Sequence, residues 1–160
     1  RVANEMPNSP LNPSAWGRMG DCHLQLGNLD SAAEAYRTVT ELPFADVTTR
    51  SQAGLGLAHV LDKLAEAAGE TGEREKLWKR SLEQCMEIVF GGNLRSVDEK
   101  LDPFWVKEAG LMAGRLARRL GRAEQEQKVY SRLAKELPGM PLWQAKLDAL
   151  RVKQETPKKP

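Results

Sequence analysis

The sequence predicts an all-α protein in which antiparallel helix pairs stack into a solenoid of about three repeats, closed by a C-terminal capping helix. A short pattern of Arg, three further residues, Glu, Met or Leu, and Pro occurs at 1–7, 37–43 and 132–138. Two glycines and a tyrosine of the first third also recur in the same order 94 residues later. Recurrence over tens of residues indicates stacked supersecondary units, and Pro ends each predicted helix.

Composition limits the class of protein. The chain has 160 residues, with 24 Lys and Arg against 22 Asp and Glu, which suits one domain without a strong preference for nucleic acid. No apolar run approaches the roughly 20 residues of a membrane-spanning helix. Cys22 and Cys85 lack the spacing of a zinc or dithiol motif, so we expect free, mostly buried thiols. The chain opens without Met, and we expect a fragment or mature segment that has lost any targeting signal.

The first predicted repeat spans 13–43, and its motif residues are, in order, Trp16, Met19, Gly20, His23, Ala32, Tyr36 and Pro43. Gly27 and Asn28 supply the turn between the two helices, and Asp30 is expected to cap the second helix. Gly20 is expected where the helices approach closely, because a larger side chain would hold them apart. The buried wedge of this pair is predicted to consist of Trp16, Met19, Tyr36 and Val39.

The second clear repeat spans 102–138, where Asp102 caps a helix that has Pro103 at its first position. Its equivalent motif residues are Gly114, Gly121, Tyr130 and Pro138. Gly110 stands where the first repeat has Trp, and Glu126 stands where it has a small residue. These two differences predict looser packing within the pair, with Phe104 and Trp105 compensating from one turn earlier.

The order of residues in these units resembles the tetratricopeptide repeat, a helix pair of about 34 residues with Trp, Leu-Gly, Tyr, Ala, Phe and Pro in sequence. Met19 and His23 are departures from that pattern. The resemblance implies a right-handed solenoid that acts as a scaffold for protein partners, with no catalytic residues and no cofactor. Segments 7–10 and 24–27 are further similar to repeats of bacterial envelope proteins, namely the Tol-Pal-associated periplasmic coordinator and the lipoprotein of the outer-membrane assembly machine. That similarity implies the periplasm, with the cytoplasm as the alternative.

The remaining segments complete a single predicted domain over 1–155. A lengthened repeat spans 47–90, with a long helix at 47–67, a break at 69–72 and an antiparallel partner at 73–90. Residues 91–101 are expected to be a surface connection. The predicted capping helix at 141–154 presents one apolar face made of Leu142, Trp143, Leu147 and Leu150. Residues 1–7 are expected to be the end of a preceding helix, and 156–160 a disordered tail.

The candidate binding surface is the concave face, which by analogy is lined by the first helix of each pair. Its groove-facing residues would be Ser14, Gly17, Asp21, Gln25, Arg50, Ala53, Leu57, Glu108, Leu111, Arg115, Arg118 and Arg119. From these we predict partner contacts by Asp21, Gln25, Arg50, Arg115, Arg118 and Arg119. The chain lacks the Lys, Asn and Arg clamp for a C-terminal carboxylate, yet three arginines could attract an acidic segment. The alternative is that they form a solvated helix face.

No pattern predicts catalysis or metal binding. Cys22 and His23 are adjacent and diverge by about 100° on a helix, and His59 has no His or Cys three or four residues away. We therefore expect a non-catalytic scaffold for a protein or peptide partner, with no nucleic acid, metal or membrane insertion. The alternative function is a spacer or self-associating segment of a longer repeat protein, for which Val2 and Met6 of the first helix would supply an apolar contact and a homo-oligomer could form.

Overall fold

The structure is a computed structural model that describes residue 9 and residues 11–155, with side chains described as far as residue 152. These residues form seven helices and contain no strand. In chain order the helices are α2 (Asn12–Gln25), α3 (Leu29–Glu41), α4 (Val47–Ala67), α5 (Thr71–Phe90), α6 (Pro103–Arg119), α7 (Ala123–Glu136) and α8 (Leu142–Glu155). The predicted helix end at 1–7, the apolar pair Val2 and Met6, and the tail at 156–160 lie outside the described residues.

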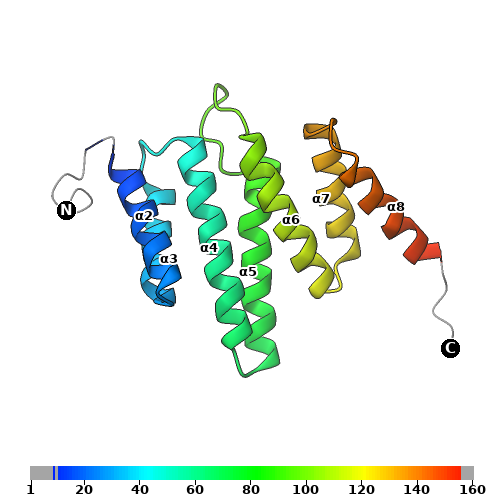
Figure 1. Cartoon of the computed structure of the whole chain (residues 1–160), viewed down its shortest axis with the longest axis horizontal. Helices are drawn as coiled ribbons and strands as arrows, with labels where there is room; N and C mark the ends of the chain where they lie inside the picture. The colour runs from blue at the N-terminus through cyan, green and yellow to red at the C-terminus, as the bar shows by residue number, and fades with distance from the viewer. Residues whose placement is uncertain (1–8, 10, 156–160) are drawn as a thin grey trace.

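The helices stack side by side in chain order (Figure 1), and each one contacts the next along the chain. The first helices of the pairs form one layer, because α2 contacts α4 and α4 contacts α6. In the layer of second helices, α5 contacts α7, whereas α3 does not contact α5. This arrangement confirms an all-α helical-repeat solenoid, and it leaves an opening between α3 and α5.

Local sequence explains where most helices begin and end. The Asp46 carboxylate accepts a hydrogen bond from the Thr49 N–H at 2.7 Å, and the Asp102 carboxylate accepts one from the Phe104 N–H at 2.9 Å. Gly91, with φ of 79°, ends α5 in the left-handed conformation that only glycine adopts without strain. Two further glycines with positive φ form the turns within the first and last pairs.

Two predicted helix starts were wrong. Asp30 is not the cap of α3, because the helix begins at Leu29 and places this carboxylate in the first turn, near the positive end of the helix dipole. Helix α5 begins at Thr71 rather than at residue 73, so Gly72 lies in its first turn. The first N–H groups of a helix have no partner within it, and glycine is therefore tolerated there at little cost.

Tyr36 is the wedge between the first two pairs. A Cβ atom built on Gly20 would lie 2.6 Å from Cε1 of Tyr36, and one built on Gly56 would lie 2.5 Å from Cζ of the same ring. Only glycine on both sides lets α2 and α4 approach the buried ring of α3 this closely. In the last pair the Tyr130 ring lies against Gly114 in the same way.

The other members of the predicted wedge are less buried than expected. Val39 is fully buried with Tyr36, but Trp16 and Met19 are only partly buried. They lie on α2, which packs against α3 and α4 but against no other helix of the described part. Among the described helices the outer flank of α2 has no neighbour, and its large side chains are partly accessible.

The looser packing predicted for the pair α6 and α7 is not seen around Gly110. Leu133 occupies the space over Gly110, because a Cβ atom there would lie 2.5 Å from Cδ1 of Leu133. Trp105 packs partly against the core, as a compensating residue would, but Phe104 is 53% exposed. Leucine from α7 therefore fills the volume that tryptophan on α6 would take.

Helix α8 covers the last pair with an apolar face. Trp143 is fully buried and stacks on Tyr130 with 6.5 Å between ring centroids, while Leu147 and Leu150 extend this contact. Leu142 was predicted to lie on the same face, but it is exposed. At the first residue of the helix, Leu142 lies about 100° around the axis from Trp143 and so points away from α7.

The cysteines differ from each other. Both are free thiols, as expected, and Cys85 is buried, which raises the pKa of its thiol to about 12. Cys22 was expected to be mostly buried, but it is exposed on α2. No helix of the described residues is long and apolar enough to cross a membrane.

Candidate partner-binding surface

The layer of first helices contains a polar cavity of about 280 Å³ between α2 and α4. Its walls are Ser14, Gly17, Arg18 and Asp21 of α2 and Thr49, Gln52 and Ala53 of α4. Three of these residues were predicted from α2 as groove-facing, and Ala53 was predicted from α4. We call this the first-helix cavity.

Asp21 lies at the wall of the first-helix cavity and is tied to the core. Its carboxylate accepts a hydrogen bond from the Tyr36 hydroxyl at 2.7 Å. Burial, and then this hydrogen bond, raise the pKa of Tyr36 well above its ordinary value. Gln25 is exposed at the end of α2 and does not line the cavity. Asp21 is thus held in place by Tyr36, whereas Gln25 does not share this contact.

Arg50, a predicted partner contact, is buried and paired within the chain. The residue is 4% exposed, and its guanidinium donates to the carbonyls of Ala45 and Asn93 and forms an ion pair with Glu99 at 2.6 Å. A buried guanidinium needs this complete set of acceptors to offset the loss of hydration. Arg50 therefore anchors the connection at 91–101 and is not available to a partner.

Arg115 and Arg119 meet on Asp62 of α4. Their guanidinium groups lie 3.3 and 3.1 Å from its two carboxylate oxygens. The Trp78 indole N–H donates to the same carboxylate at 3.0 Å, and the Arg119 guanidinium lies over the Trp78 ring, 5.3 Å from its centroid. Asp62 thus joins three helices, although no local spacing in the sequence connects it with α5 and α6.

Arg118 points in another direction and pairs with Glu126 of α7. The guanidinium donates from Nε at 3.0 Å and from a terminal nitrogen at 2.5 Å to one carboxylate oxygen. This hydrogen bond, and then the charge of Glu126, raise the pKa of Arg118. The three predicted arginines therefore do not form one cradle, because two face α4 and one faces α7.

His59 lies on α4 near Asp62 and Arg115, and its pKa departs from the ordinary value. Burial, followed by the charge of Arg115, lowers the pKa of His59, which favours the neutral imidazole. Among the described residues, no three His, Cys, Asp or Glu side chains are grouped so that they could hold a metal ion. The described side chains of this face provide hydrogen-bonding groups and charges.

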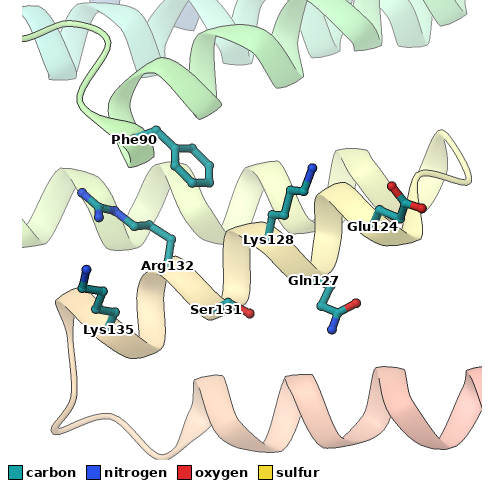
Figure 2. Close-up of a pocket in the computed structure, with 7 residues that line it drawn as sticks. All are labelled: Phe90, Glu124, Gln127, Lys128, Ser131, Arg132 and Lys135. Atoms are coloured by element: carbon teal, nitrogen blue, oxygen red, sulfur yellow. The ribbon is translucent and has the colours of Figure 1, made fainter.

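A broader hollow of about 520 Å³ lies along α7, on the layer of second helices. Figure 2 shows the Phe90 ring at the end of α5 directed toward α7, beside the long side chains of Lys128 and Arg132. Six of its seven lining residues come from α7. The hollow is therefore mainly the face of one helix with a single aromatic wall.

The comparisons with known proteins agree with the helix pairing. Residues 13–46 match the model of a family described as tetratricopeptide repeat. The match covers α2, α3 and the connection to α4, including the Gly20 and Tyr36 contact. The chain has no significant match among the curated proteins. Residues 13–46 therefore match a tetratricopeptide repeat, and this match supports the resemblance to the tetratricopeptide-repeat superfamily.

Proposed function

We propose that this chain is a non-catalytic scaffold that binds a peptide or helix of another protein on the concave face formed by α2, α4 and α6. Tetratricopeptide repeats in general mediate protein–protein interactions. The observation that carries the proposal for this face is the first-helix cavity between α2 and α4.

The first-helix cavity suits a peptide because its polar groups are free. In the described part of the chain, the side chains of Ser14, Arg18 and Gln52 have no hydrogen-bond partner. A peptide backbone brings one donor and one acceptor per residue and can satisfy such groups. Asp21, fixed by the Tyr36 hydroxyl, adds an acceptor in a defined position.

The arginines of α6 support this proposal less well. A partner carboxylate at Arg115 or Arg119 would compete with Asp62, which already holds both. Arg118 is held in the same way by Glu126. The preferred contacts are therefore at α2 and α4, and the partner would reach the arginines of α6 only at its far end.

Site-specific photo-crosslinking tests the location of the partner. A photoreactive phenylalanine at Gln52, inside the first-helix cavity, is expected to form covalent adducts with one defined partner in cells. The same probe at Asp148, exposed on α8, is the matched control and is expected to form none. Adducts from Asp148 but not from Gln52 would show that binding occurs elsewhere.

A self-associating segment remains the alternative, and the oligomeric state tests it. The segment on which that alternative was based, with Val2 and Met6, lies outside the described residues. Sedimentation of the full chain over a range of concentrations is expected to give a monomer under the scaffold proposal. A dimer that dissociates on dilution would favour self-association.

A further inference from the structure

A second polar cleft, of about 430 Å³, opens on the layer of second helices where α3 and α5 are separated. One wall carries Arg37 and Thr40 of α3, and the other carries Arg80, Gln84 and Glu87 of α5. Gly54 and other residues of α4 form the floor between the two walls. We call this the outer cleft.

The connection at 91–101 closes one end of the outer cleft and is held firmly. The buried Arg50 guanidinium binds the Asn93 carbonyl and Glu99, and the Asn93 amide donates to the Ser51 hydroxyl at 2.7 Å. From the same connection, Arg95 donates to the carbonyls of Thr40 and Leu42 at the end of α3, at 2.5 Å each. These bonds tie α3, α4 and the connection together, so the outer cleft is preformed by the fold.

The outer cleft has an excess of positive charge that the chain leaves partly unpaired. Its lining contains four arginines and one carboxylate, that of Glu87. Arg50 and Arg95 are used by the fold as described above. Arg37 and Arg80 are exposed and have no hydrogen bond or ion pair from their guanidinium groups among the described residues. Two guanidinium groups on facing walls are thus free to bind an anion.

We propose that the outer cleft binds an acidic peptide segment of a partner protein through Arg37 and Arg80. The planar guanidinium group donates two parallel hydrogen bonds to a carboxylate, so each arginine suits one Asp or Glu side chain. Arg95 adds positive charge at the closed end of the cleft. The proposal is separate from the proposed concave-face binding, because it uses the other layer of helices.

The lining favours a peptide over a nucleic acid. It contains no aromatic side chain on which a base could stack, whereas single-stranded nucleic acids use such platforms. Glu87 would repel an evenly charged phosphate backbone, but a peptide can place an N–H donor there. The hollow along α7 in Figure 2 carries no comparable proposal, since Arg132 is paired with Glu136 at 3.0 Å and α7 supplies most of its lining.

An NMR titration of the isotopically labelled full chain tests the site. The probe is a peptide of alternating Glu and Gly, and the control peptide has Gln in place of Glu. We expect the Glu peptide to shift amide signals at residues 37–42, 80–87 and 92–95, with affinity that falls as salt rises. The Gln peptide is expected to shift none. Shifts confined to α2 and α6 would overturn the proposal.

Two charge-matched double variants distinguish binding at the outer cleft from non-specific electrostatic attraction to the protein surface. Arg37→Glu with Arg80→Glu is expected to weaken binding at least tenfold, while Arg18→Glu with Arg151→Glu is expected to change it less than twofold. All four arginines are exposed, and thermal unfolding checks that both variants fold. Equal weakening by both variants would overturn the proposal.

The second variant pair also distinguishes this proposal from the concave-face proposal, because Arg18 lines the first-helix cavity. Loss of peptide binding only with Arg18→Glu and Arg151→Glu would assign the acidic peptide to the concave face and refute the outer cleft. A ten-nucleotide single-stranded RNA is the final probe. RNA that binds more tightly than the Glu peptide through Arg37 and Arg80 would refute a peptide as the occupant.

Discussion

The two tyrosines at equivalent places in the two clear repeats have the same inner contact and different outer ones. Tyr36 and Tyr130 each lie against a glycine of the first helix of their own pair. Beyond that contact, Tyr36 meets Gly56 of the next pair, and its hydroxyl donates to Asp21. Tyr130 instead stacks on Trp143 of the terminal helix, and Lys146 lies over its ring at 5.2 Å.

The difference shows which part of a repeat its motif determines. The glycine and tyrosine within one pair set how closely its two helices pack. What covers the outer side of the ring depends on the next element, which is a glycine of the following pair in the interior and a tryptophan of α8 at the end. The inner contact is therefore the constant feature of the solenoid, and its cover is adapted to position.

Removing either tyrosine ring is expected to lower the free energy of unfolding more than any other change considered. Tyr36→Ala should lower the free energy of unfolding by about 3–5 kcal/mol, because it leaves a cavity between two backbones that have no side chain to fill it. Tyr130→Ala should cost less, since the Trp143 ring on α8 can move into the space. Urea denaturation measures both values, and a larger loss for Tyr130→Ala would contradict this explanation.

Adding a methyl group at the inner contact should have the next largest effect on stability. Gly20→Ala and Gly114→Ala each place a Cβ atom into a buried tyrosine ring and are expected to destabilise by about 1–3 kcal/mol. Gly17→Ala is the matched control, because it lies on α2 with nothing within 4 Å of its Cβ position. The control should be neutral or stabilising by up to about 1 kcal/mol, as expected for alanine in a helix. Thermal unfolding compares the three variants.

The pair Arg118 and Glu126 distinguishes the last repeat from the first. Arg118→Met is expected to cost about 1–3 kcal/mol, because it leaves the carboxylate of Glu126, which is 3% exposed, without its donor. Glu126→Ala should cost less, since the guanidinium is 57% exposed and can be hydrated, and since Ala32 occupies the equivalent position of the first repeat. Urea denaturation of both variants is the measurement, and the reverse order would contradict the assignment.

Removing the hydroxyl of Tyr36 should change the free energy of unfolding the least. The size of this change depends on pH. Tyr36→Phe removes the hydrogen bond to Asp21 and is expected to cost about 0.5–1.5 kcal/mol at neutral pH. The pKa of Tyr36 is raised in the folded chain above its ordinary value of 10.0, so its contribution to stability is complete below that pH and declines as pH rises above it. The wild type should therefore lose more stability than Tyr36→Phe between about pH 9 and 11. Equal losses of stability in the two proteins would show that the pKa of Tyr36 does not change on unfolding.

The helix pairs could be predicted from sequence because their signals are local. Apolar periodicity, the cap at Asp102 and the turn glycines act within one or two turns of the chain. Gly20 was expected where the two helices of the pair approach closely, and the structure places the Tyr36 ring against it.

The candidate site could be predicted only in part, because it depends on which side chains meet across helices. Analogy placed Arg50 in a groove, but the connection at 91–101 folds over it and supplies its acceptors. Three arginines near the end of α6 were grouped by their spacing, whereas Asp62 and Glu126 divide them between two neighbours. These carboxylates come from α4 and α7, and no local pattern connects them to α6.

The ion-paired junction around Asp62 has a mechanical consequence. It binds α4, α5 and α6 into one unit, and the buried Arg50 fastens the connection at 91–101 to that unit. Helix α8 has no such tie and contacts α7 alone among the described helices. A force applied along the long axis should therefore detach α8 before it separates α4, α5 and α6.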